Sequence, residues 1–117
     1  MEGFRRGRLL RIFVDEADRR GIAPLYVGVV DYLRAQGVAG ASIFRGIEGY
    51  GGHREVHLAK ALSWVPNLPI VIEVVDDDET IARILPELER IVGDGLITLE
   101  AAEYLQLRRN APAARPS

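Results

Sequence analysis

The chain has no cysteine among its 117 residues. Disulfide bonds, thiolate nucleophiles and cysteine-ligated zinc are therefore excluded, and a reducing compartment is the expected location. No apolar run reaches the roughly 20 residues that a membrane-spanning helix needs, and the first residues lack the apolar stretch of a signal peptide. The sequence predicts a protein that works in the cytoplasm and does not itself span a membrane.

An excess of positive charge is also missing. The net charge is −2, and the basic residues are spread along the chain. Because nucleic-acid binding normally needs a concentrated basic surface, no nucleic-acid partner is expected. The apolar fraction of 48% and the charged fraction of 27% are typical of globular proteins. We expect a single domain over residues 1–109, followed by a disordered, low-complexity tail over 110–117.

Catalytic motifs are missing as well. The serines at 42, 63 and 117 have neither a nucleophile elbow nor a triad context. The glycine-rich stretch over 46–52 matches neither the dinucleotide-binding fingerprint nor a Walker loop. The sequence therefore predicts no enzyme activity, with an unrecognised catalytic site as an alternative.

Apolar periodicity divides the chain into elements in the order strand, helix, strand, strand, helix, strand. Runs of bulky or β-branched residues predict the strands, and stripes repeating every three to four residues predict the helices. The predicted elements are a strand over 8–14, a helix over 24–36, strands over 40–47 and 70–75, a helix after the aspartates at 76–78, and a last strand from 96–99 continuing toward 107. This order predicts a ferredoxin-like α+β sandwich, a four-stranded antiparallel sheet with two helices on one face.

Proline and glycine mark the expected helix ends. Pro24 opens the first helix, because a proline in the first turn gives up no hydrogen bond, and Gly37 suits a left-handed cap at its end. Asp76, Asp77 and Asp78 supply N-cap candidates for the second helix, although in a cleft between subunits they could also touch a ligand. Pro86 lies inside the second stripe, where it predicts a kink or a broken turn.

A sheet of this kind leaves one face bare of helices. Residues 70–75 (IVIEVV) are apolar on both faces of their strand. We therefore expect the bare face to pack against another subunit. Residues 56–65 fit a helical stripe as well as a strand, and we favour a strand with irregular ends.

The segment over 46–67 is predicted to be a long loop, because its clustered glycines disfavour packed structure. Glycine backbone N–H groups can cradle an anion, and an arginine can pair with a phosphate. The predicted ligand-binding residues are Arg45, Gly46, Glu48, Gly49, Tyr50 and Gly51. In the alternative reading the glycines only shape a long turn.

Other polar residues have weaker patterns. His53 and His57 alternate with Glu55 and would share one face of a strand, an arrangement that can bind zinc. The acidic group at Asp15, Glu16 and Asp18 is interpreted as a solvated loop or a helix cap, and the alternatives are a cation site or an acid and base pair. Trp64 is expected in the core or in an interface.

Four stretches together resemble an uncharacterised bacterial family of PII-like proteins. They are GVAGASIFRGIEGYG over 37–51, LPIVIEVVD over 68–76 with the apolar helix after it, GLITLE over 95–100, and ADRRGIAPLY over 17–26. The resemblance covers residues 8–105. It implies a ferredoxin-like fold, a homotrimer whose sheets form a barrel-like centre, and ligands, often adenine nucleotides, bound between subunits near the base of the loop.

The resemblance favours one of four hypotheses. In the first, the protein is a signalling regulator that binds a small anionic ligand, such as an adenine nucleotide, and engages a partner protein through the loop over 46–67. In the second, it is a divalent-metal-binding protein of ion homeostasis, with His53 and His57 as ligands. An enzyme and a purely structural scaffold are the remaining alternatives.

Overall fold

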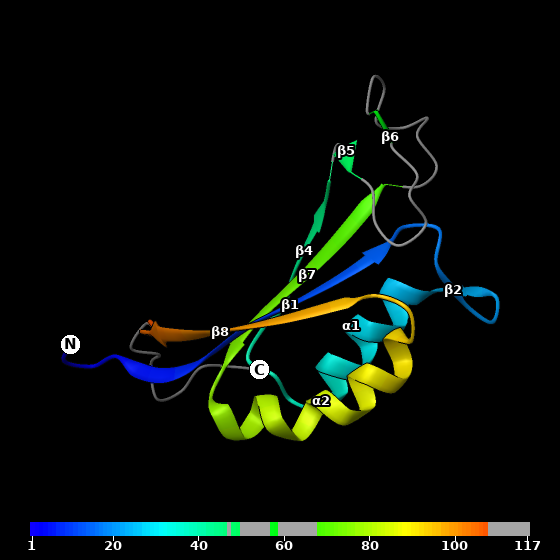
Figure 1. The fold of residues 1–117 in the computed structure, drawn as a ribbon. Coiled ribbons are helices and arrows are strands. Elements are labelled where there is room, and N and C mark those ends of the chain that lie inside the picture. The colour runs from blue at the N-terminus through cyan, green and yellow to red at the C-terminus, as the bar shows by residue number, and fades with distance from the viewer. Residues whose placement is uncertain (47, 50–56, 59–67, 108–117) are drawn as a thin grey trace, which may run out of the picture.

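The computed structural model describes residues 1–46, 48–49, 57–58 and 68–107. Figure 1 shows two helices packed beneath a twisted sheet. The elements are β1 (Arg5–Asp15), β2 (Arg19–Arg20), β3 (Ala23–Pro24), α1 (Leu25–Ala35), β4 (Ser42–Arg45), β5 (Glu48–Gly49), β6 (His57–Leu58), β7 (Pro69–Asp76), α2 (Asp78–Val92) and β8 (Leu96–Tyr104). Neither described helix is long and apolar enough to cross a membrane.

The main sheet has the strand order β4-β7-β1-β8, with every neighbouring pair antiparallel. Both helices lie on the same face of this sheet and contact each other (Figure 1). The fold is therefore a ferredoxin-like α+β sandwich, and the predicted fold class is confirmed. Two short pairs, β2 with β3 and β5 with β6, lie outside the main sheet.

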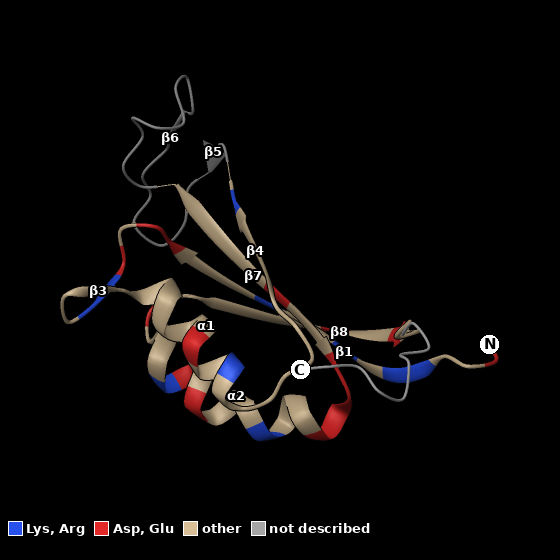
Figure 2. Ribbon diagram, turned by 180° about the vertical axis from the view of Figure 1, so that it is seen from behind, with Lys and Arg blue, Asp and Glu red and all other residues tan. Residues whose placement is uncertain are grey.

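Alternation along the two central strands decides which side chains form the core. Leu10 and Ile12 on β1, with Ile72 and Val74 on β7, face the helices and are at most 1% exposed. The helices bury against them the residues Leu25, Val29, Leu33, Ile81, Ile84, Leu88, Ile91 and Val92. Figure 2 marks the charged residues along both helices, and among the described residues none of them is buried. This layer pattern follows from a two-residue period in the strands and a 3.6-residue period in the helices.

The first helix begins and ends where its proline and glycine predict. Pro24 is the N-cap residue of α1, and the helix ends at Ala35. Gly37 follows with φ of 74°, a left-handed conformation that suits glycine. The helix predicted over 24–36 is confirmed.

The second helix is continuous from Asp78 to Val92, with Pro86 inside it. Of the two expected outcomes at Pro86, the broken turn is therefore wrong, and the kink stays a prediction. Pro86 is in the third turn, and the helix tolerates the lost N–H because packing of its apolar stripe supplies most of its stability. Asp77 caps the helix by accepting a hydrogen bond of 2.8 Å from the Thr80 N–H, and Gly93 ends it with φ of 65°.

The predicted strands differ from the observed ones mainly at their ends. β1 begins three residues earlier than predicted because it continues along β8 beyond the end of β7. The strand predicted over 40–47 is observed over Ser42–Arg45. Within the range 56–65 only His57–Leu58 is described, as strand β6. The predicted tail over 110–117 lies outside the described residues.

Candidate functional site

The candidate site is the end of the sheet from which the segment over 46–67 departs. β4 ends at Arg45, and the chain returns to the sheet at Leu68 and enters β7. Pairing places Arg45 opposite Ile70 on one side of β7 and Asp15 opposite Pro69 on the other. Two strand ends that are 30 residues apart in sequence therefore flank the start of β7.

Gly46 lies against the returning chain. Its N–H donates a hydrogen bond of 2.7 Å to the Pro69 carbonyl. A Cβ added at this position would lie 2.6 Å from the Pro69 Cγ. A glycine is needed here because the two chain segments approach closely, which explains one of the glycines in the predicted ligand-binding set.

Arg45 holds a carboxylate. Its Nε donates to Oε2 of Glu16 over 2.8 Å, and its Nη2 donates to Oε1 over 2.9 Å. The side chains are 35% and 25% exposed, respectively. This fork is the geometry with which arginine binds carboxylate or phosphate. Arg45, predicted to bind an anion, therefore binds an anionic group of its own chain.

Glu16 is the residue whose role the sequence analysis missed. Its backbone N–H donates over 2.9 Å to the carbonyl of Leu68, which fixes it beside the returning chain. The sequence placed it only in an acidic group with Asp15 and Asp18. The strand order held the missing signal, because it puts the residue after β1 and the last residue of β4 on either side of β7.

The rest of the acidic group shapes the turn between β1 and α1. The Asp18 carboxylate accepts a hydrogen bond of 2.9 Å from the Asp15 N–H, and the Asp18 carbonyl accepts one of 2.8 Å from the Leu25 N–H. Asp18 thus connects the end of β1 to the start of α1. This arrangement agrees with the loop-and-cap reading of the group.

Only some of the remaining predicted site residues are among those that the structure describes. Glu48 and Gly49 form β5 and pair with Leu58 and His57 of β6. Tyr50, Gly51, His53 and Trp64 lie outside the described residues, so their predicted roles stay predictions. Among the described residues, no three metal-ligating side chains are grouped to hold a metal ion.

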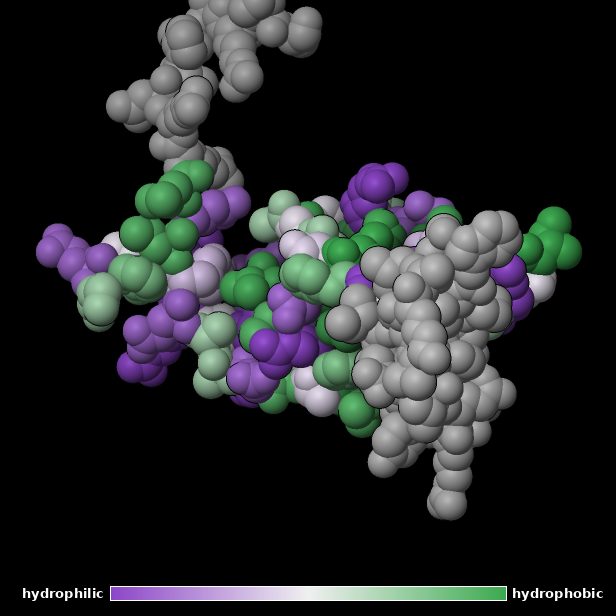
Figure 3. Space-filling view, turned by 90° about the horizontal axis from the view of Figure 1, so that it is seen from above, coloured by the Kyte–Doolittle hydropathy of each residue, from purple (hydrophilic) through white to green (hydrophobic). Residues whose placement is uncertain are grey.

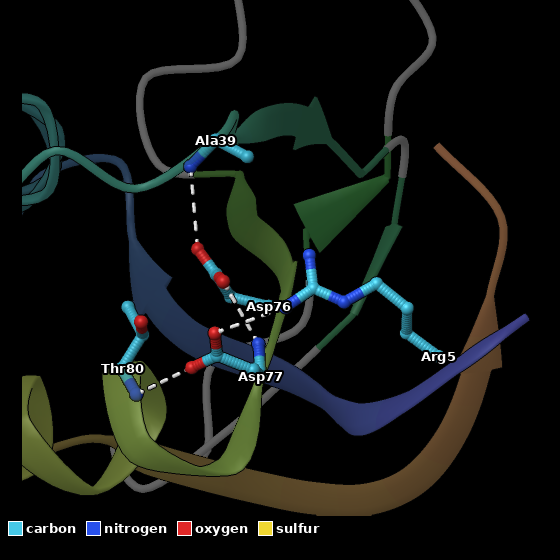
Figure 4. A network of polar contacts seen from close by, with 5 residues as sticks. All are labelled: Arg5, Ala39, Asp76, Asp77 and Thr80. Atoms are coloured by element: carbon cyan, nitrogen blue, oxygen red, sulfur yellow. Dashed lines mark hydrogen bonds and ion pairs between the residues drawn. The ribbon is translucent and has the colours of Figure 1, made fainter. Parts of the chain in front are cut away.

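Asp76 and Asp77 lie at the opposite end of β7 (Figure 4). The Asp76 carboxylate accepts hydrogen bonds from the N–H groups of Ala39 (3.3 Å) and Asp77 (2.8 Å). The hydrogen bond from the Thr80 N–H lowers the pKa of the Asp77 carboxyl below its ordinary value, and the charge of Arg5, 3.6 Å away, adds to this shift. These contacts tie α2 to the sheet, and of the three N-cap candidates they confirm Asp77.

An open hollow of about 400 Å³ adjoins this network. It is lined by Arg5, Ala39, Gly40, Ser42, Glu73, Val75, Asp76, Tyr104 and Gln106. Its two carboxylates already accept hydrogen bonds or ion pairs from the protein itself. The hollow adjoins the end of β7 opposite to the loop, and the expectation that Asp76 could touch a ligand between subunits stays a prediction.

The bare face of the sheet combines apolar and charged side chains (Figure 3). Arg11 bridges Glu73, at 2.7 Å from its Nε, and Glu100. The hydrogen bond to Glu73, and to a smaller extent the one to Glu100, raises the pKa of Arg11 above its ordinary value. Beside this network is an apolar hollow of about 380 Å³, which Phe13, Phe44 and Val71 line with Arg11 and Glu73.

A two-layer sandwich with a bare sheet face and a long segment between its second and third main strands is a ferredoxin-like α+β fold. The chain itself belongs to the DUF190 family (Uncharacterized ACR, COG1993), whose model matches residues 7–104.

Relatives of unknown function share much of the sequence. A UPF0166 protein of Aquifex aeolicus (strain VF5) is 37% identical over 100 residues, which cover 86% of this chain and 94% of the relative. A UPF0166 protein of Methanocaldococcus jannaschii is 34% identical over 95 residues, which cover 80% and 87% of the two chains.

Solved structures share the fold at low identity. CPII, a nitrogen regulatory PII-like protein of Thiomonas intermedia K12, solved with ADP and bicarbonate bound, matches with a TM-score of 0.66 and 16% identity, covering 88% of this chain and 92% of CPII. A Thermus thermophilus protein described as PII-like matches with a TM-score of 0.61 and 19% identity, covering 87% and 92%. These likenesses show that the chain shares the fold of PII-like proteins, and together with the family match they bear out the resemblance to an uncharacterised family of that fold.

Proposed function

We propose that this chain is a PII-like regulatory protein that binds a small anionic ligand, an adenine nucleotide, at the loop-bearing end of the sheet. The observation that carries the proposal is the partly exposed guanidinium of Arg45, held at the base of the loop in the fork geometry that suits an oxyanion. The shared fold of CPII, solved with ADP and bicarbonate, supports the choice of ligand.

The proposed ligand site extends from Arg45 and Gly46 into the loop. Glu48, Gly49, Tyr50 and Gly51 would complete it, with glycine N–H groups around the anion and Tyr50 reporting its presence. A signal would then pass through the loop over 46–67 to a partner protein in the cytoplasm. The chain would act through binding and not through catalysis.

We further propose that the protein is a homotrimer assembled through the bare sheet face. Phe44 and Leu96 are 51% and 57% exposed, and by the strand register both belong to this face. Contiguous apolar surface on a small protein is typical of an interaction site. In such a trimer the nucleotide would lie between subunits.

Calorimetric titration of the full chain with ADP, AMP and ATP, each with and without bicarbonate, tests the proposal. A bound nucleotide raises the free energy of unfolding by about 2.7 kcal/mol at a hundredfold excess over its Kd, so thermal shift gives an independent readout. Arg45→Ala should abolish binding. Arg90→Ala, which breaks an ion pair on α2, should leave it unchanged.

Absence of any nucleotide binding to the wild-type protein would overturn the proposal. A zinc- or copper-dependent shift lost in a His53→Ala/His57→Ala double variant would instead support the metal-homeostasis alternative, which rests at present on sequence spacing alone.

A further inference from the structure

The ion pair of Arg45 and Glu16 is built into the sheet. Each partner adjoins a backbone hydrogen bond to the returning chain, Glu16 through its own N–H to Leu68 and Arg45 through the N–H of Gly46 to Pro69. The register of β4, β7 and β1 then sets the spacing of the two side chains across the start of β7. Their position is therefore fixed by the fold and not by a chance meeting of flexible surface chains.

The carboxylate of Glu16 occupies two of the donors with which Arg45 would grip a ligand. Both oxygens are engaged, one by Nε and one by Nη2. A planar carboxylate or bicarbonate, or two oxygens of a phosphate, fits the same fork. An oxyanion ligand and the Glu16 carboxylate therefore cannot bind these two N–H groups of Arg45 at the same time.

The pair is also open to solutes. Arg45 is 35% exposed and Glu16 is 25% exposed, so water reaches both partners. An ion pair at such a position is only weakly stable because solvent screens it. A dissolved oxyanion can therefore replace the carboxylate without the core being unfolded.

From this geometry we infer that the Glu16 carboxylate competes with oxyanion ligands for the guanidinium of Arg45. A ligand binds Arg45 only when it displaces Glu16. The inference rests on the proposed function in one respect, that Arg45 is a ligand residue. Glu16 then sets the ligand concentration at which the site fills, because the apparent affinity is reduced by the fraction of molecules in which Arg45 is available. The ligand chemistry is an oxyanion, either free or as the phosphate of a nucleotide.

The central variant is Glu16→Gln, which keeps the shape of the side chain and removes its charge. The chain offers a matched control in Glu87→Gln, because Arg90 on α2 holds Glu87 through the same fork of Nε and Nη2. Inorganic phosphate, bicarbonate and ADP are titrated into both variants and the wild type at constant ionic strength. These ligands separate a free anion from a nucleotide.

Glu16→Gln should bind phosphate and ADP about tenfold more tightly than the wild type if the pair is closed in about nine molecules of ten. Glu87→Gln should match the wild type. The double variant Glu16→Gln/Arg45→Gln should bind neither ligand.

Two other outcomes separate the two proposals, and a third overturns both. Equal ADP affinity in Glu16→Gln and the wild type would overturn the competition by Glu16 and leave the proposed function intact. Tighter phosphate binding to Glu16→Gln without any ADP binding would support the competition by Glu16 and overturn the nucleotide proposal. Binding of neither anion to any variant would overturn both.

A second measurement needs no variant, so it stands even if Glu16→Gln folds poorly. The Nε–H resonance of Arg45 in the wild-type protein reports the acceptor of that hydrogen bond. Saturating phosphate or ADP should shift it, while the Nε–H resonance of Arg90 should stay unchanged. A ligand that binds without moving the Arg45 resonance would overturn the inference.

Discussion

The two faces of the sheet are made by alternate residues of the same strands, yet their chemistry differs. Toward the helices, Leu10, Ile12 and Ile72 are completely buried, and no charged side chain is buried among the described residues. On the bare face, Arg11 and Glu73 pair in the middle of the sheet. The chain thus closes one face with its own helices and leaves the other with a mixed surface.

The mixed face is informative because it is neither a core nor an ordinary surface. Exposed Phe44 and Leu96 favour burial, whereas the ion network of Arg11 with Glu73 and Glu100 loses solvent when it is covered. Because covering these charges removes their solvent, the network disfavours unspecific stacking of another sheet on this face. A partner that covers this face must therefore keep the network satisfied, which a symmetric copy of the same chain can do through a fixed register.

The largest expected effect comes from the helix-covered face. Ile72→Ala removes a fully buried side chain and should lower the free energy of unfolding by about 2–5 kcal/mol at every protein concentration. Its neighbour Val71 lies on the bare face beside the apolar hollow. Val71→Ala should cost less, and its cost should rise with protein concentration if copies cover that face. Urea denaturation over a concentration series measures both, and equal, concentration-independent losses would contradict the comparison.

The next largest effect is expected at Gly7, near the start of β1, where β1 pairs with β8. Gly7→Ala would bring a Cβ to 2.2 Å from the Asp76 carbonyl oxygen and 2.7 Å from a ring carbon of Tyr104. The strands must shift, at an expected cost of about 1–3 kcal/mol. Gly28→Ala is the matched control, because it lies on α1 with no atom near the added Cβ and should stabilise by about 1 kcal/mol. Thermal unfolding that ranks the two variants in the reverse order would disprove the close approach.

Ile43 and Phe44 are neighbours on β4 that lie on opposite faces of the sheet, so substitutions at these two positions compare the faces directly. Ile43 and Phe44 are similarly exposed, at 45% and 51%, but the register places Ile43 on the helix side and Phe44 on the bare side. Phe44→Asp should dissociate the proposed trimer into monomers, because each subunit would bury a carboxylate that has no partner. Ile43→Asp should leave it assembled. Sedimentation velocity measures the assembly, and a trimer that survives Phe44→Asp would show that the bare face is not its interface.

Much of this architecture could be predicted from the sequence, for reasons that differ between elements. Alternation in β7 and the stripe of α2 are strong because burial decides nearly every position. The sequence left open whether α2 would continue through Pro86, because a local rule about proline does not include packing against β1. The pairing of Arg45 with Glu16 was missed because it depends on strand order, which brings together residues 29 positions apart.

The smallest expected effect is the pH dependence of the cap that holds α2 on the covered face. In the folded protein the Thr80 N–H lowers the pKa of Asp77, so the ionised carboxylate stabilises the fold above the ordinary aspartate pKa of about 4. This contribution falls as the pH drops through the folded-state pKa, where the carboxylate gains its proton. Asp77→Asn keeps a capping oxygen but does not titrate. Its urea midpoint should therefore lie slightly below that of the wild type at pH 7, and the difference should shrink below about pH 4. A difference that stays constant between about pH 7 and about pH 3 would mean that the cap acts through its shape and not through its charge.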